Sequence, residues 1–195
     1  MILTEQTTLP AASLPLDLLK QHLRLGTAFA SATEQDELLE AYLRAAIAGI
    51  EGRTGQVLMA KSFTWQLHGW RSYDRQILPL RPVQQVTAVR LVDRFDAVSV
   101  VDADRYYLAK DAQNPALIAV GLALPVVPQA GTVEIDFDAG YGADWSDVPE
   151  DLARAVILLA ADFYDNRTSR DALGWPTAVL ALVERFRKLR LGATL

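Results

Sequence analysis

The stretch TVEIDFDAGYGADWSDVPEDLARAVILLAADFYDNR, residues 132–167, contains both kinds of secondary structure from which the chain is built. In its first part Val133, Ile135 and Phe137 alternate with polar residues, which predicts a strand with one buried face. In its second part, apolar residues recur at helical spacing behind a proline, which predicts a buried helix over residues 149–164. This stretch therefore predicts a strand followed closely by a core helix.

The same stretch is strongly acidic. Its carboxylates between Glu134 and Asp151, with no lysine or arginine among them, are Glu134, Asp136, Asp138, Asp144, Asp147, Glu150 and Asp151. The first three share the polar face of the predicted strand. The other four lie in a turn and a first helical turn, where acids cap backbone N–H groups and complement the helix dipole. A structural role accounts for all seven.

An enzymatic role for residues 134–151 is the alternative, in the form of a small metal-dependent hydrolase. Such a site needs further ligands, and the only histidines, His22 and His68, lie in different segments without ligand spacing. The alternation around His68 predicts that it faces solvent. The chain also lacks the glycine-rich phosphate loops and the GxSxG motif of hydrolases. We therefore predict no enzyme activity, no catalytic or metal-binding residue and no cofactor.

Composition narrows the class of protein further. The 195 residues are 51% hydrophobic and 22% charged, which is typical of a globular protein. The net charge of -5 argues against a polycation that coats nucleic acid. The absence of cysteine excludes a disulfide framework and a thiolate zinc site. No stretch has the form of a secretory signal or a membrane span, so we expect a soluble protein that is made in the cytoplasm and does not bind membranes.

The order of predicted elements indicates an α+β fold in a single domain over residues 1–195. Helices are expected over 13–55 and again over 148–191. Between them, over 60–142, lie short segments with strand alternation and many β-branched residues. The expected architecture is a helical bundle with an antiparallel β region inserted between the N-terminal and C-terminal helices.

Helix boundaries in the first half are predicted from capping residues. Ser13 is the expected N-cap of the first helix, and Gly26 follows its expected end. Thr33 and Asp36 resemble a capping box at the start of the second helix. Gly55 is the expected C-cap of that helix.

The last predicted helix, TAVLALVERFRKLRL, combines an apolar stripe with a cluster of basic residues. Two interpretations stay open. Cations near a helix C-terminus complement the dipole, but a basic amphipathic helix also fits a partner groove, an acidic surface or DNA. The polar loop ending in Trp175–Pro176 would give such a helix a hinge. The candidate partner-binding residues are Val179, Leu182, Val183, Arg185, Phe186, Arg187, Lys188, Leu189 and Arg190.

Four segments in order give the chain a resemblance to a known family. They are DELLEAYLRAAIAGIEGRTGQVL, LPLRPVQQVTAVRLVD, VEIDFDAGYG and VPEDLARAVILLAADFYDNR. This succession resembles the head–tail connector, or adaptor, proteins of long-tailed bacteriophages, which also occur in phage-derived gene transfer agents. The most specific parts are AGYG followed by VPEDLARAV and FYDNR, together with LPLRPV.

The resemblance implies a virion structural protein rather than an enzyme. Members of this family form a ring, usually a dodecamer, under the portal at the neck of the particle. The ring extends the DNA channel and offers a platform to the stopper or tail-completion protein, and DNA passes through it without specific binding. The terminal helix of related proteins tends to engage the portal, which implies the same role for residues 177–195.

Overall fold

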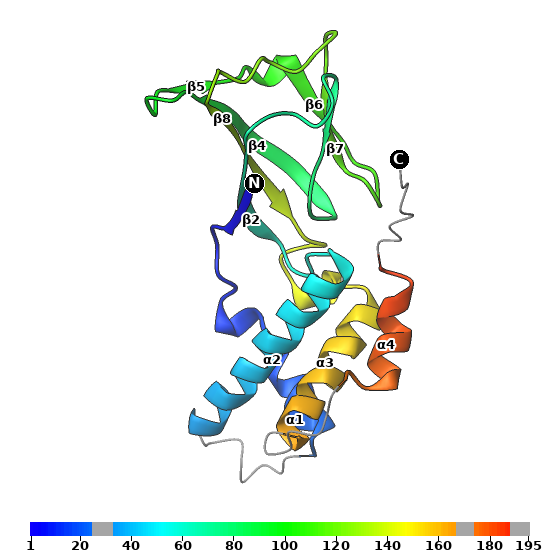
Figure 1. Ribbon diagram of the computed structural model, residues 1–195. Coiled ribbons are helices and arrows are strands. Elements are labelled where there is room, and N and C mark those ends of the chain that lie inside the picture. Colours follow the sequence, from blue (N-terminus) through cyan, green and yellow to red (C-terminus); the bar gives the residue numbers. More distant parts are fainter. Residues whose placement is uncertain (25–32, 167–173, 188–195) are drawn as a thin grey trace. The chain divides into compact units, whose positions relative to one another are not determined.

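The computed structural model describes residues 1–24, 33–166 and 174–187, and it divides the chain into two compact units (Figure 1). The β unit comprises residues 1–8 and 59–141, and the helical unit comprises residues 9–58 and 142–195. The predicted α+β class, with a β region inserted between helices, is confirmed. The single domain predicted over the whole chain stays a prediction.

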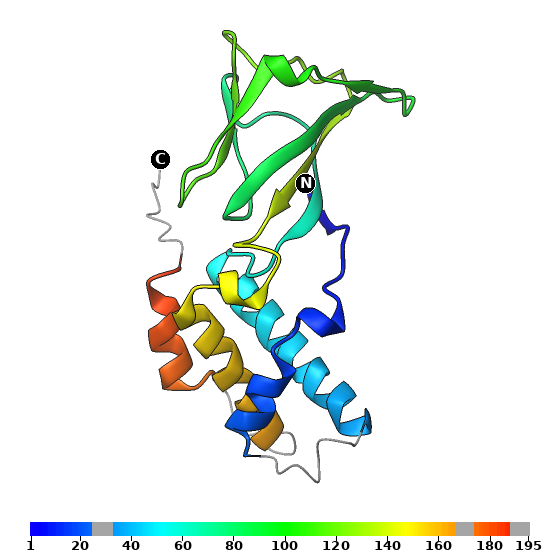
Figure 2. The ribbon, with the colours of Figure 1, turned by 180° about the vertical axis from the view of Figure 1, so that it is seen from behind.

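The helical unit is organised around one buried helix. Its helices are α1 (Leu16–His22), α2 (Thr33–Thr54), α3 (Glu150–Asp165) and α4 (Thr177–Glu184), with 3-10 turns η1 (Ala11–Ser13) and η4 (Trp145–Asp147). Helix α3 contacts each of the other three helices, and Figure 2 shows it between α2 and α4. Its residues Leu152, Val156 and Leu159 are fully buried. The predicted core helix is therefore confirmed, although Phe163 at its end is only half-buried.

The predicted helix ends are partly right. Ser13 belongs to η1, and α1 begins after Pro15 without a side-chain cap, so the predicted N-cap is wrong. The reason is that Pro15 occupies the N-cap position of α1. Its backbone is non-helical, and the helix begins at the next residue, Leu16. Helix α2 begins at Thr33 and ends before Gly55, whose φ of +68° confirms the predicted C-cap. Gly26 and the side-chain contacts of Thr33 lie outside what the structure describes.

The β unit contains two antiparallel sheets. The larger sheet has the strand order β1-β2-β8-β4-β5, and the smaller has the order β3-β7-β6. The strands are β1 (Ile2–Glu5), β2 (Lys61–Leu67), β3 (Arg75–Ile77), β4 (Val83–Val92), β5 (Val98–Val100), β6 (Tyr106–Ala109), β7 (Ala116–Ala119) and β8 (Thr132–Ala139), and η3 (Ala103–Arg105) precedes β6. Strands β1 and β3 were not predicted. Because β1 pairs with β2, the β region includes the N-terminus as well as residues 60–142.

The core of the β unit follows from the alternation in β2 and β8. Both strands bury every second residue along their length. Phe63 and Phe137 are directly opposite each other in the ladder, and their rings stack with centroids 5.7 Å apart. The intervening polar residues form the opposite face of the larger sheet, as the sequence predicts. Among the residues that the structure describes, no helix has both the length and the apolar character needed to cross a lipid bilayer.

Candidate functional site

The acids of β8 lie on the polar face of the larger sheet, where Arg90 of β4 joins them. Arg90 donates from Nε to Glu134 Oε2 at 3.2 Å and from Nη2 to Asp136 Oδ1 at 3.0 Å. Burial alone would lower the pKa of Arg90, but its hydrogen bonds with Asp136 and Glu134 and their negative charges outweigh burial and raise that pKa. The guanidinium therefore neutralises two of the three acids on this face.

Neighbouring polar side chains also donate hydrogen bonds to these acids. Thr64 Oγ1 donates to Asp136 Oδ1 at 2.7 Å, which places Asp136 between β2 and β4. Asp138 accepts from Ser62 Oγ and from Gln85 Nε2, each at 2.7 Å. The carboxylates of β8 thus form side-chain hydrogen bonds with both neighbouring strands, β2 and β4.

This arrangement differs from a metal centre in the way its oxygen atoms are used. A divalent ion needs several oxygen ligands that are free to converge on one point, whereas Asp136 and Asp138 accept hydrogen bonds from side chains on both flanking strands. Within residues 1–24, 33–166 and 174–187, no three His, Cys, Asp or Glu residues are grouped as metal ligands would be. The geometry supports the structural interpretation of the acidic window.

The other four acids of the window belong to the helical unit. Asp147 accepts from the backbone N–H of Asp144 at 3.1 Å, so these two residues form a capping box around η4. Glu150 and Asp151 occupy the first turn of α3, as predicted. His68 is exposed, as its alternation predicts, and lies in the β unit, whereas His22 lies in the helical unit.

We expect Asp136→Asn to lower the free energy of unfolding by about 1 kcal/mol, because Arg90 and Thr64 lose a charged acceptor that is only partly exposed to solvent. Urea unfolding followed by circular dichroism measures this change. Asp104→Asn is the matched control, because Asp104 is exposed, and it should change stability by less than about 0.5 kcal/mol. Micromolar binding of a divalent ion that disappears in the Asp136 variant would contradict the structural role.

The apolar stripe of the last predicted helix is largely buried within the helical unit. Val179 and Val183 are fully buried, and their helix α4 packs against α3. Leu182 and Phe186 are half-buried. The described helix ends at Glu184, earlier than the sequence predicts. In this conformation the two valines are core residues, so they are covered by their own bundle rather than offered to a partner.

The basic residues described at this end of the chain, Arg185 and Arg187, already have partners. Arg185 Nη2 lies 2.8 Å from Asp151 Oδ2 at the start of α3, and its guanidinium lies 4.6 Å from the ring centroid of Phe186. Arg187 Nη1 lies 3.0 Å from Glu184 Oε1. All three basic and aromatic side chains remain partly or largely exposed. The candidate residues Lys188, Leu189 and Arg190 lie outside the described part of the chain.

Residues 167–173 of the loop that the sequence predicts as a hinge lie outside the described part of the chain, but Trp175 at its end packs against α2. A Cβ added at Gly49 of α2 would lie only 3.1 Å from the ring of Trp175, so glycine permits this close approach. The guanidinium carbon of Arg53 lies 5.2 Å from the centroid of the same ring. Trp175 therefore fixes the start of α4 against α2.

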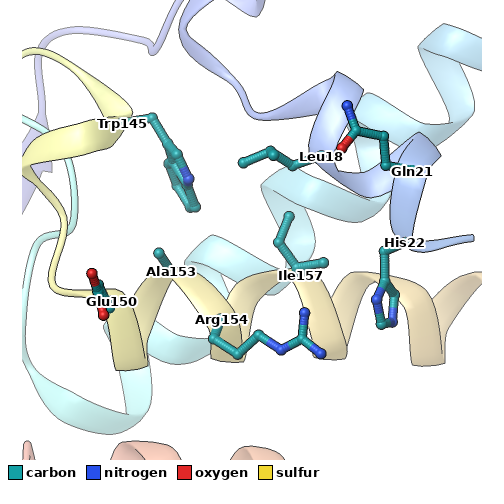
Figure 3. Close-up of a pocket in the computed structure, with 8 residues that line it drawn as sticks. All are labelled: Leu18, Gln21, His22, Trp145, Glu150, Ala153, Arg154 and Ile157. Carbon is teal, nitrogen blue, oxygen red and sulfur yellow. The ribbon is translucent and has the colours of Figure 1, made fainter.

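A pocket of about 450 Å³ lies between α1, η4 and α3 (Figure 3). Its lining residues are Leu18, Gln21, His22, Trp145, Glu150, Ala153, Arg154 and Ile157. Leu18, Trp145 and Ile157 give it apolar walls, and the Arg154 side chain extends along α3 towards His22. The sequence analysis did not find this pocket, because its lining comes from three separate segments. The polar side chains of Gln21, His22, Glu150 and Arg154 complete its lining beside these apolar walls.

The AGYG and LPLRPV segments, which carry the family resemblance, contain residues with structural constraints. Gly140 has a φ of +131°, and a Cβ there would lie 2.5 Å from backbone atoms of Met59 and Ala60. In the second segment, Arg81 is buried and hydrogen-bonds the backbone and side chain of Gln113. Burial lowers the pKa of Arg81. Gly140 is therefore required by the close approach of the backbone at Met59 and Ala60, and Arg81 is held in the interior by its hydrogen bonds with Gln113.

The chain is similar over nearly its whole length to solved chains of gene transfer agent (GTA) particles. It is 47% identical to a chain from the neck of an empty GTA particle computed with C6 symmetry, with a TM-score of 0.91, covering 99% of this chain and 98% of that one. It is 47% identical to a chain in the virion of a native GTA particle, with a TM-score of 0.89 and the same coverage. A chain from the neck of a native GTA particle computed with C12 symmetry is 44% identical, with a TM-score of 0.85 and again the same coverage.

Comparison with protein-family models gives no match, and comparison with curated proteins gives none either. The similarity therefore rests on solved particle structures, and these cover both units of the chain.

Proposed function

Because this chain belongs to the family of gene transfer agent neck proteins, we propose that it is the head–tail adaptor of such a particle or of a related phage. It is a structural protein of the neck, and it joins the portal to the stopper or tail. The observation that carries this function is identity of 44–47% across 98–99% of both chains to neck and virion chains. Similarity of that extent leaves little of the chain for an unrelated activity.

The adaptor acts as a ring of identical copies, and twelve is the number we infer. Neck structures of related particles were computed with C6 and C12 symmetry, which supports a closed ring around the DNA path. Cyclic rings are also the assemblies that repeated head-to-tail contacts form when the rotation closes. The ring extends the channel through which DNA passes.

The charge of the chain suits passage of DNA better than capture of DNA. The net charge is -5, and the salt-bridged face of the larger sheet contains three acids and one arginine. A lining with many lysine and arginine contacts to phosphate would hold DNA strongly and in a salt-dependent way. The adaptor therefore conducts DNA without specific binding.

The C-terminal segment is the part of the adaptor that binds the portal. Phe186 and Arg187 follow the end of α4 at Glu184, and Leu189 lies three residues after Phe186, at helical spacing in the sequence. Val179 and Val183 contribute by anchoring α4 to its bundle, and the contacts with the portal come from residues 185–190. The proposed portal-binding segment is therefore residues 185–190, which is shorter than the segment 177–195 that the sequence resemblance implies.

We expect producer cells that lack this chain to release DNA-filled heads without tails, because the portal then has no platform for the stopper. Electron microscopy of purified particles measures the tailed fraction, and a plasmid copy of the wild-type chain should restore it. A matched plasmid copy of Asp104→Asn, an exposed position, should restore tails equally well. Tailed particles that still transfer DNA without the chain would rule out the adaptor function.

A further inference from the structure

Exposed large apolar side chains are unevenly divided between the two units. In the described part of the chain, the helical unit exposes only Leu18 and Leu38. The β unit exposes Met1, Ile2, Leu3, Tyr73, Ile77, Phe95, Val98, Val100, Tyr107, Val120, Leu122 and Val126. Isolated exposed apolar residues are ordinary, but clusters of them mark surfaces that another molecule covers.

One cluster lies on the outer face of the smaller sheet and the segments beside it. We call residues 71–77, 105–111 and 116–122 the small-sheet surface. Across it, Arg75, Ile118 and Tyr107 stand in one row of the strand register. The backbone N–H of Val120 donates to Arg105 O. Tyr73, Ile77, Tyr107, Val120 and Leu122 are exposed on this surface, and Leu122 is 93% exposed.

The second cluster lies on the hairpin of β4 and β5, at the edge of the larger sheet. We call residues 93–102 the hairpin surface. Phe95, Val98 and Val100 are 74%, 57% and 70% exposed there. Val98 and Val100 pair with Val92 and Arg90 of β4, and β5 has no second neighbour within the described sheet. An exposed apolar edge strand offers unpaired backbone groups and apolar side chains that another chain can bind.

The charged residues of the two surfaces are complementary. The small-sheet surface contains the cations Arg71, Arg75, Arg105 and Lys110 and the acids Asp74 and Asp111. The hairpin surface contains the acids Asp93, Asp96 and Asp102 and the cation Arg94. Opposite charges around apolar centres suppress like-with-like contacts and fix the register of an interface.

Both surfaces are exposed in the same chain, so they do not cover each other within one copy. A head-to-tail contact between copies requires two different surfaces on every copy, and it closes into a ring when the rotation permits. We propose that the small-sheet surface of one copy packs against the hairpin surface of the next copy around the ring. This inference rests on the proposed ring function and assigns its subunit contact to the β unit.

The cysteine-free sequence allows a direct test by cross-linking in particles. Val98→Cys on the hairpin surface is combined in one chain with a cysteine replacing Tyr107, Val120 or Leu122 on the small-sheet surface. After mild oxidation, or treatment with a short bis-maleimide, at least one double variant should give a ladder of covalent oligomers on a denaturing gel. Particles that contain a mixture of the two single variants should give dimers and nothing larger, because each copy then offers one reactive side.

A matched control carries cysteines at two exposed positions of the helical unit, Glu37→Cys and Asp165→Cys, and should give no ladder. If the double variants enter the neck but none of them forms a ladder above this control, the proposed contact is wrong and the adaptor function still stands. If the wild-type chain is absent from the necks of purified particles, the adaptor function fails and the contact fails with it.

Discussion

Replacement of Leu159 by alanine should lower the free energy of unfolding of the helical unit by about 2–5 kcal/mol. Leu159 is fully buried in α3, the helix that contacts α1, α2 and α4. The deletion removes the transfer free energy of the side chain and leaves a cavity. Gly49 of α2 lies close to both Leu159 and the Trp175 ring, so the deleted atoms belong to the packed contact between α2 and α3. We therefore expect a loss in the upper half of the range.

The control for this prediction is the adjacent Leu158→Ala. Leu158 is also a leucine of α3, but its side chain is only half-buried. It should lose about 1 kcal/mol, since less apolar surface leaves the core. Chemical unfolding followed by far-ultraviolet circular dichroism reports the helical unit for both variants. A loss below about 1 kcal/mol for Leu159→Ala would mean that α3 is peripheral.

The main elements of the fold could be predicted because their sequence patterns have one physical explanation. The alternation that leads up to His68 places Phe63, Trp65 and Leu67 on one face, which fits only a strand with one buried face, and the structure buries all three. Helix α3 has an apolar stripe too long for a strand, and Gly55 has the left-handed φ that its position requires. In each case the local pattern and the tertiary environment agree.

Other features could not be predicted because they depend on contacts between distant segments. Strand β1 exposes all four residues, so its sequence has no buried alternation, and it is a strand because it pairs with β2. Strand β3 buries only Gln76 and has the reverse of the usual pattern. The partner of the acidic window, Arg90, lies on β4 and reaches Asp136 only through the strand register.

The apolar stripe of α4 shows why a docking helix is hard to recognise from sequence. Helical spacing establishes that Val179 and Val183 lie on a face that something covers, but the pattern is the same whether the cover belongs to the same chain or to a partner. Here α3 covers them. Removing residues 177–195 would therefore expose the core of the helical unit as well as remove the proposed portal contact, and it would not separate the two roles.

A shorter truncation separates folding from docking. A chain that ends at Arg187 keeps Val179, Val183 and the pair between Arg185 and Asp151. It lacks Lys188, Leu189 and Arg190, which extend the stripe and the basic rim. We expect this chain to unfold at the same urea concentration as the full chain and to lose binding to isolated portal rings.

In the full-length chain, Phe186→Ala should weaken portal binding by about 2 kcal/mol or more, roughly thirty-fold, because buried aromatic anchors dominate interfaces of this kind. The matched control is Ala181→Ser, an exposed position on α4 away from the stripe, which should bind as the wild type does. Biolayer interferometry with immobilised portal rings measures the wild type, the two variants and the chain that ends at Arg187. Raised salt should weaken the wild type only modestly, because charges at the rim mainly govern the association rate. If the chain ending at Arg187 binds portal rings as tightly as the full chain, the docking surface lies elsewhere, and α4 serves only to complete the helical bundle.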